Sequence, residues 1–327
     1  MKRTSIAIVA LVALQFAAPF GAVAQQSRTM RHIGVLANLE GRDGDAFRQG
    51  LREAGYVVGQ NLVIEHRRFA RGSAEGLTTK AADLVRLKVE VIFAQGPAAL
   101  AAAANATREI PIVAVDNVSD PIEAGFVKSL SRPGGNVTGF FLDLPELMGK
   151  WLELLKDTLP RLSRVAVLWD PASGPYQLRA ARSAGRVLGV RLQTLEARSP
   201  DDFEGAFAAA RRAQAEAMIL LSSPLVYFNS QRLAELASQN RMPAIAYYHG
   251  FPEAAGLMSY GLSGDLLVYL FRSNGAQVGR ILNGAKPGDL PIERPIKFEL
   301  TLNLKTARAL GLTISQSMLL RADRVIR

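Results

Sequence analysis

The chain has 327 residues, with 39 Lys and Arg against 29 Asp and Glu, and it contains no cysteine. The lack of cysteine excludes disulfides and thiolate metal sites, and the length predicts two domains. A formal net charge of +10 at pH 7 occurs in nucleic-acid-binding proteins, but here the Arg residues are spread along predicted helices. The dense cluster is limited to Arg67, Arg68 and Arg71, so we interpret the charge as solvated helix faces and expect no nucleic-acid partner.

Residues 1–24 have the three parts of a secretory signal peptide in order. Lys2 and Arg3 form the positive start, 6–14 is an apolar run, and an Ala-Val-Ala cleavage motif ends at Ala24. The apolar run is much shorter than the roughly 20 residues that span a bilayer, which disfavours a membrane anchor. Removing Lys2 and Arg3 lowers the formal charge from +10 to +8, because 1–24 contain no acidic residue. We expect a mature chain in the periplasm.

The first third of the mature chain alternates short β-branched runs with amphipathic or alanine-rich segments. This alternation predicts a parallel sheet covered by helices on both faces. Predicted strands cover 32–37, 62–66, 89–93 and 112–115, and predicted helices cover 45–54, 74–87 and 96–107.

The segment from 110 to 141 closes this first unit and leads into a second. Asp120 followed by Pro121 is a helix start, with Asp as the N-cap and Pro at the first helical position. The pattern predicts a helix over 122–130, a stop at the Arg-Pro-Gly-Gly sequence of 132–135, and a strand over 137–141. Ligand sites are common at such places, because strand ends and helix N-termini converge there.

The α/β rhythm then repeats. Predicted helices cover 147–158, 176–188, 201–212, 229–240, 264–282 and 304–310, and predicted strands cover 165–169, 191–195, 217–221, 244–246, 257–260 and 296–303. We therefore predict an α/β fold of two Rossmann-like lobes with parallel sheets. The last quarter lacks a complete unit, so we expect its elements to return to the earlier sheets and to form a hinge with several crossings.

Motifs for catalysis, metals and cofactors are missing. His32, His66 and His249 lie far apart and offer no metal-ligand spacing. The chain has no Gly-x-Ser-x-Gly elbow, no Walker A loop, and no Gly-x-Gly-x-x-Gly after a predicted strand. We expect no enzyme activity, no metal and no cofactor, although paired carboxylates cannot be identified from sequence alone.

Polar and aromatic residues gather instead at the predicted carboxyl ends of the strands, where parallel sheets bind ligands. The candidate ligand-binding residues are Asn38, Gln95, Asp116, Ser119, Asp120, Trp169, Tyr176, Ser222, Tyr247 and Tyr260, with Asp170, Ser223 and Tyr248 beside them. Such a set suits a small polar ligand with an apolar part: backbone N–H groups near Gly96 and Ile122 for a carboxylate, an Asp for an ammonium group, and a Tyr ring for stacking. Ordinary turn and capping chemistry is the alternative for each residue, as in the N-cap Asp120.

Several motifs resemble the periplasmic substrate-binding proteins of ABC transporters with the type I binding-protein fold, in the group related to aromatic amino acid binding proteins. They occur in order over about 31–327. They are FRQGLREAGY at 47–56 with GQN at 59–61, IPIV at 110–113 with DP at 120–121, SLSRPGGNVTG at 129–139, AGLMSYG at 255–261, and KFEL at 297–300 with NLKTA at 303–307 and ALGL at 309–312.

The resemblance implies one lobe of 30–141 plus 264–288 and another of 142–262 plus 291–327. It implies a monomer that captures a small solute, such as an amino acid or aromatic compound, and delivers it to an ABC permease in the inner membrane. Ser119 stands where the family often has Gly, and Asp170 where it often has Asn. A sensory ligand-binding protein that signals to a membrane receptor, and a periplasmic enzyme acting on a small metabolite, stay as alternatives.

Overall fold

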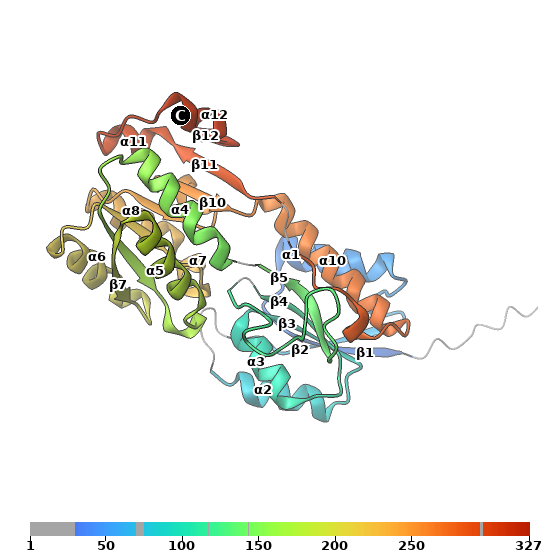
Figure 1. Ribbon diagram of the computed structural model, residues 1–327. Coiled ribbons are helices and arrows are strands. Elements are labelled where there is room, and N and C mark those ends of the chain that lie inside the picture. Colours follow the sequence, from blue (N-terminus) through green and yellow to red (C-terminus); the bar gives the residue numbers. More distant parts are fainter. Residues whose placement is uncertain (1–29, 70–74, 117, 143, 295–296) are drawn as a thin grey trace, which may run out of the picture.

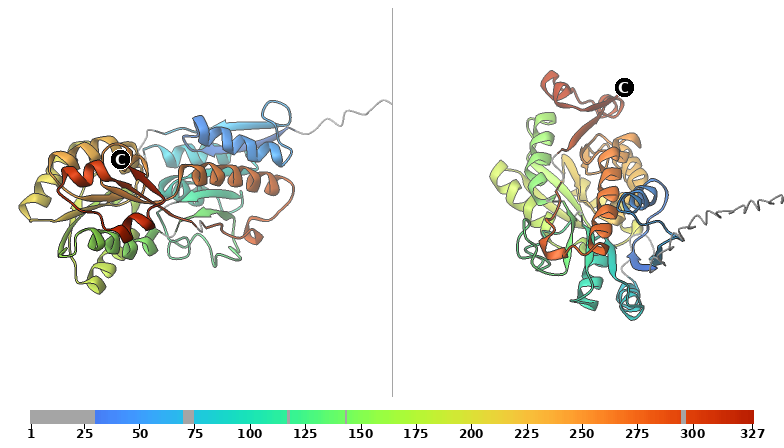
Figure 2. Two further views of the ribbon diagram at one scale, coloured as in Figure 1. Left: turned by 90° about the horizontal axis from the view of Figure 1, so that it is seen from above. Right: turned by 90° about the vertical axis from the view of Figure 1, so that its right-hand side faces the viewer.

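The computed structural model describes residues 30–69, 75–116, 118–142, 144–294 and 297–327, so the expected signal peptide lies outside the described residues. Strands and helices alternate along the chain and form two α/β lobes that lie side by side in Figures 1 and 2. The predicted two-lobed α/β fold is confirmed. None of the helices in the described ranges combines the length and apolarity that a membrane crossing needs.

Five parallel strands form the first sheet: β1 (Arg31–Leu36), β2 (Leu62–His66), β3 (Val91–Gln95), β4 (Ile112–Asp116) and β5 (Val137–Phe141). Four helices cover it: α1 (Gly41–Glu53), α2 (Leu77–Arg86), α3 (Pro97–Ala106) and α10 (Gly264–Leu282). The strand order is β2-β1-β3-β4-β5. Helices α1 and α10 pack on one face and α2 and α3 on the other, which buries β4 and β5 completely.

Helices α1 and α10 come unusually close, although more than 200 residues separate them in sequence. A Cβ on Gly275 would lie 2.1 Å from the Phe47 carbonyl oxygen, and one on Gly50 would lie 1.9 Å from the Arg272 carbonyl oxygen. Glycine at both positions therefore lets the two backbones touch, which ties the late helix α10 to the first sheet.

Seven strands form the second sheet: β6 (Arg164–Trp169), β7 (Arg191–Glu196), β8 (Ala217–Leu220), β9 (Ala244–Ala246), β10 (Met258–Gly261), β11 (Glu299–Asn303) and β12 (Arg324–Ile326). Their order is β12-β11-β10-β9-β8-β6-β7. All neighbours are parallel except β10 and β11, so this sheet is mixed where we expected a parallel one. The late strands do return to an earlier sheet.

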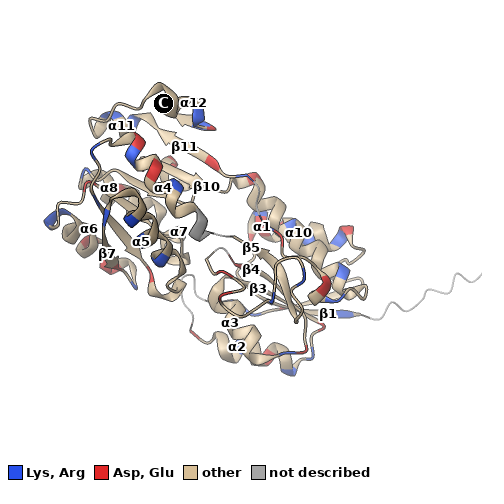
Figure 3. Ribbon diagram, in the orientation of Figure 1, with Lys and Arg blue, Asp and Glu red and all other residues tan. Residues whose placement is uncertain are grey.

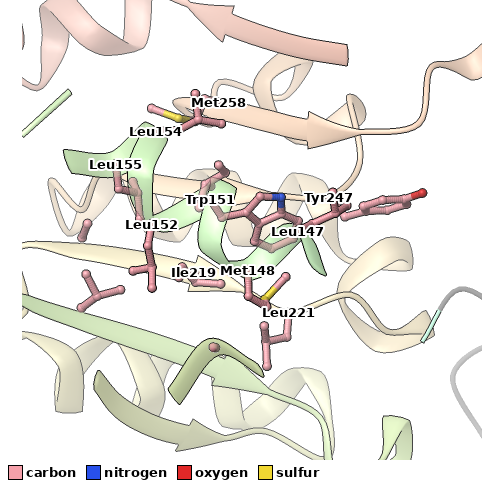
Figure 4. Close-up of a cluster of buried hydrophobic side chains, with 14 of the residues drawn as sticks. Leu147, Met148, Trp151, Leu152, Leu154, Leu155, Ile219, Leu221, Tyr247 and Met258 are labelled. Carbon is pink, nitrogen blue, oxygen red and sulfur yellow. The ribbon is translucent and has the colours of Figure 1, made fainter. Parts of the chain in front are cut away.

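Eight helices accompany the second sheet: α4 (Leu144–Thr158), α5 (Tyr176–Leu188), α6 (Phe203–Arg212), α7 (Pro224–Phe228), α8 (Ser230–Gln239), α9 (Gly250–Glu253), α11 (Leu304–Ala309) and α12 (Gln316–Arg321). Three short 3-10 turns lie among the elements: η1 (Pro171–Ser173), η2 (Pro200–Asp202) and η3 (Pro287–Asp289). The fully buried Trp151 of α4 packs against Met148 and Tyr247 in the core of this lobe (Figure 4). Its indole Nε1 donates a hydrogen bond to the Tyr260 carbonyl at 2.9 Å, which fixes α4 against β10.

The chain passes between the sheets three times: between β5 and α4, between β10 and α10, and between η3 and β11. At the third passage Glu293 forms a bridge with Phe140 and accepts hydrogen bonds from the Ser273 hydroxyl and the Gln277 amide. From these passages we propose the lobe boundaries given above, 30–141 plus 264–288 and 142–262 plus 291–327.

The helix expected over 122–130 is wrong; the structure has turns there. The Asp120 carboxylate accepts from the Ile122 and Glu123 amides at 2.8 and 3.1 Å, so the predicted cap chemistry is present. One turn later Gly125 takes a φ of 75°, which a continuing α-helix does not allow. The segment therefore stops after a single turn.

Charged residues are spread over both lobes. Figure 3 shows Lys and Arg spread over both lobes with Asp and Glu among them, although the charged residues of α5 are all Arg. This distribution supports the interpretation of the net charge as solvated helix faces.

Candidate functional site

A cavity of about 160 Å³ lies between the carboxyl ends of the two sheets. The first sheet and its helices contribute Asn38, Asp43, Phe69, Gln95, Gly96, Pro97, Ala98, Ala99, Val115, Val118, Leu267 and Phe271. The second sheet and its helices contribute Asp170, Ala172, Ser223, Pro224, Tyr227, Phe228 and Tyr248. The volume holds on the order of ten water molecules, so the cavity suits a small solute.

The wall on the first lobe begins with Asn38, two residues after β1. Its side chain is paired twice with Phe69: Nδ2 donates to the Phe69 carbonyl at 2.8 Å, and Oδ1 accepts from the Phe69 amide at 3.3 Å. This pairing places the Phe69 ring on the cavity. Gln95, the last residue of β3, also lines the cavity, and its buried Oε1 accepts no hydrogen bond from the described residues.

The first residues of α3 also line the cavity on the side of the first lobe. Gly96 takes a φ of 87°, which brings the strand sharply into the helix, and its amide donates to the Val115 carbonyl at 2.7 Å. Pro97 occupies the first helical position. The amides of the first helical turn have no acceptor within the helix, and those of Ala98 and Ala99 belong to cavity-lining residues. Such amides favour negative charge.

Aromatic rings form the wall on the second lobe. Ser223 caps the short helix α7, because its hydroxyl accepts from the Val226 amide at 3.1 Å. The helix presents Tyr227 and Phe228 to the cavity, and the Tyr227 ring lies 4.5 Å from that of Tyr248, centroid to centroid. The Tyr248 hydroxyl forms a hydrogen bond of 2.9 Å with the Ser222 hydroxyl. The wall therefore combines apolar area with phenol groups.

Two carboxylates lie on the cavity, one from each lobe. Asp170 follows β6 and is buried, and its Oδ1 accepts from the Ala172 amide at 2.9 Å. Burial raises the pKa of the Asp170 carboxyl above its ordinary value, although the Ala172 hydrogen bond lowers it. Asp43, in the first turn of α1, is partly buried; burial raises its pKa as well, and the charge of Arg42 opposes the shift.

Of the predicted site residues, Asn38 and Gln95 line the cavity, as do the accompanying Asp170, Ser223 and Tyr248. Asp116 and Ser119 are buried directly behind it, next to the lining residues Val115 and Val118. Asp116 Oδ1 accepts from the Val118 and Ser119 amides at 2.8 and 3.2 Å. Asp120 caps the following turn and lies outside the lining.

The remaining five predicted residues lie near the cavity or in the core, but outside the described lining. Trp169 donates from Nε1 to the Gly174 carbonyl at 2.9 Å, and Tyr176 lies under the guanidinium of Arg179. Ser222 is buried beneath Tyr248. Tyr247 belongs to the buried core and Tyr260 packs against it, with its ring 5.9 Å from that of Phe298.

The residues that sequence reasoning missed lie further along the chain, in the loop or the helix that follows a strand. Asp43, Phe69, Tyr227 and Phe228 are the clearest examples. For Tyr227 and Phe228 a signal existed, because Ser223 followed by Pro224 is a helix start directly after a predicted strand. Within the described ranges, His, Asp and Glu form no group able to hold a metal ion.

Comparisons with known proteins agree with this architecture. The family model described as ABC transporter substrate binding protein matches residues 32–326. A tyrosine-binding protein of Clostridioides difficile strain R20291 is 26% identical over 300 residues, which cover 88% of this chain and 82% of that protein.

Two solved structures have the same fold. A Streptococcus pneumonia ABC domain in complex with L-Trp has a TM-score of 0.79 at 23% identity and covers 91% of this chain and 100% of its own. A ligand-free, open substrate-binding protein with adhesive properties from Clostridium difficile has a TM-score of 0.62 at 24% identity and covers 91% of this chain and 99% of its own.

Proposed function

The chain belongs to the ABC transporter substrate-binding protein family, and we propose that it captures a small solute in the cavity between its lobes and delivers it to an ABC permease of the inner membrane. Proteins of this family bind solutes rather than convert them. We propose that the chain works in the periplasm after cleavage near Ala24, as a monomer and without a cofactor.

The observation that carries this proposal is the composition of the cavity. Its polar groups and its rings come from both sheets, with Asn38 and Gln95 on one side and Asp170, Tyr227 and Tyr248 on the other. Neither lobe alone encloses a ligand, so binding requires the lobes to close. A change of shape on binding is the property that a permease needs to distinguish loaded from empty protein.

The lining also indicates the chemistry of the ligand. The rings of Tyr227, Phe228 and Tyr248 suit a planar apolar group, and the polar groups near Gln95 and Asp170 suit hydrogen-bond donors. Relatives bind aromatic amino acids, tyrosine in one and L-Trp in another. We propose an amino acid or another aromatic compound as the solute.

The predicted residues outside the lining support the residues that line the cavity. Asp116, Ser119 and Asp120 shape the loop that carries Val118 to the cavity. Ser222 holds the Tyr248 hydroxyl, and Trp169 lies beside Asp170. We propose that Tyr176, Tyr247 and Tyr260 act through packing behind or beside the cavity.

A thermal-shift screen of residues 25–327 tests this function with amino acids, aromatic acids, aromatic amines and sugars. A ligand at a hundred times its dissociation constant stabilises a protein by about 2.7 kcal/mol. We expect at least one aromatic compound to raise the melting temperature, and Tyr248→Ala to abolish the shift while Tyr227 and Phe228 stay in place. A screen without any hit in all four classes would contradict solute binding.

A further inference from the structure

The two carboxylates on the cavity come from different lobes. Asp43 stands in the first turn of α1, and Asp170 stands at the carboxyl end of β6. When the lobes come together, both negative charges border one small space that excludes much of the water. Burial raises the pKa of both carboxyls; the charge of Arg42 opposes this shift at Asp43, and the Ala172 and Ser223 hydrogen bonds and the charge of Arg198 oppose it at Asp170.

One further acceptor on the cavity has no hydrogen-bond donor among the described residues. Gln95 contributes a buried Oε1 that accepts nothing from the described residues. Among the described lining residues there is no Lys, Arg or His to pair with Asp43 or Asp170. An occupant with a positively charged N–H group would satisfy such an acceptor with a charge-assisted hydrogen bond and place its charge near the two carboxylates.

This charge arrangement connects ligand binding to closure. A ligand shifts the equilibrium between open and closed forms only by its different affinity for the two. A cation in the cavity lies near carboxylates of both lobes at once, so its attraction to them favours the closed form. The same cation can lie against the faces of Tyr227 and Tyr248, which attract positive charge.

A zwitterionic amino acid fits this arrangement less well. Its carboxylate has one favourable place, at the Ala98 and Ala99 amides that begin α3. A zwitterion, however, brings its own carboxylate into a cavity that Asp43 and Asp170 already border, and it adds no net positive charge. An aromatic amine brings a net positive charge together with the ring.

We propose that the solute is an aromatic amine, a ring that carries a protonated nitrogen and no carboxylate, with Asp170 and Asp43 as the residues that determine this preference. This inference rests on the proposed function and narrows its ligand class.

Two ligand series with a constant ring test the inference by titration calorimetry on residues 25–327. One series is L-tyrosine, tyramine and 4-hydroxyphenylpropanoate; the other is L-tryptophan, tryptamine and indole-3-propionate. In at least one series we expect the amine to bind at least tenfold more tightly than the amino acid, and the acid to bind more weakly than both. High salt should weaken the amine more than the amino acid.

Three variants identify the carboxylates responsible. Asp170→Asn and, independently, Asp43→Asn should each lower the affinity for the amine at least tenfold and remove its advantage over the amino acid. Asp265→Asn is the matched control, because this Asp lies on α10 outside the cavity with its side chain 97% exposed. Melting curves establish that each variant is folded.

The outcomes separate this inference from the proposed function. Tighter binding of the amino acid, or of the carboxylic acid, would overturn the amine preference and leave solute binding intact. Failure of all six compounds would overturn it too, whereas solute binding falls only if the broader screen is also empty. Equal loss of amine affinity in Asp265→Asn would contradict the assignment to the cavity carboxylates.

Discussion

Asp116 is a fully buried carboxyl at the end of β4, one residue beyond the cavity lining. Burial raises its pKa from 3.8 to about 6, against the hydrogen bonds that it accepts from Ser119 and Val118. The folded protein therefore retains a proton on Asp116 over a pH range in which the unfolded chain has lost it. The contribution of Asp116 to the free energy of unfolding consequently falls as the pH rises from about 4 to about 6.

Asp116→Asn should show this effect directly. The amide keeps an oxygen for the Val118 and Ser119 amides and cannot ionise. The stability of the variant relative to the wild type should increase by up to about 3 kcal/mol between pH 4 and pH 7. Urea unfolding of both proteins at the two pH values measures it, and all other titrating groups cancel in the comparison. A difference independent of pH would mean that Asp116 titrates normally.

Single residues could be predicted from the sequence where the chain is simplest, at the ends of strands. Gln95 ends the buried strand β3, Asn38 lies two residues after the buried end of β1, and both line the cavity. Asp43 and Phe69 were not predicted, because their positions depend on how α1 begins and on the pairing of Phe69 with Asn38. Contacts of this kind link residues about thirty positions apart and leave no local pattern.

Helices and strands could be predicted from the sequence where a short stretch of residues carries the pattern that defines them. Strands β2, β5 and β9 and helices α5 and α10 have the predicted bounds, because β-branched runs and helical periodicity mark them clearly. The helix over 122–130 failed because Gly125 adopts a left-handed conformation after one turn. Four short elements, α7, α9, α12 and β12, were missed, since segments of three to six residues show no period.

The close contact between α1 and α10 predicts that Gly275→Ala destabilises the protein, whereas a Gly→Ala substitution at an open helix position should stabilise it. In Gly275→Ala the new Cβ would lie 2.1 Å from the Phe47 carbonyl oxygen, so the helices must separate. We expect a loss of about 1–3 kcal/mol of stability. Gly205→Ala in α6 is the control: nothing lies within 4 Å of its Cβ, and Ala should stabilise the helix by about 0.5–1 kcal/mol. Thermal unfolding of both variants measures the two effects; a neutral Gly275→Ala would show that the contact is not tight.

At the scale of the whole molecule, the alternation of strands and helices predicted two α/β lobes, and the structure has them. The antiparallel strand β11 was not predicted, because strand direction depends on the path of the chain between lobes. The set of residues that lines the cavity could not be predicted from the sequence either, because it depends on how the chain passes between the lobes. Residues from 38 to 271 meet there only after both sheets have formed and come together.

An ion pair joins the lobes at the surface: Arg179 of α5 pairs with Glu123, in the turn that follows Asp120. Both side chains are about half exposed, so such a pair contributes roughly 0–1 kcal/mol. Because the pair requires closed lobes, Glu123→Gln should weaken ligand binding by up to about fivefold and leave stability nearly unchanged. Isothermal titration measures the affinity.

Glu204→Gln is the matched control for this substitution. Glu204 pairs with Arg232 at 2.8 Å within the second lobe, with similar exposure, so its loss should leave the affinity unchanged. High salt should remove the difference between wild type and Glu123→Gln, because it screens exposed charges. Equal effects of the two substitutions would mean that the pair between the lobes has no role in closure.

Closure of the two lobes around a solute is tested most directly by small-angle X-ray scattering of residues 25–327, free and saturated with the tightest compound from the screen. The cavity is bordered by residues of both lobes, so a bound solute should hold the lobes together. We predict a smaller radius of gyration with the compound than without it. An identical scattering curve at saturation would contradict the closing cavity.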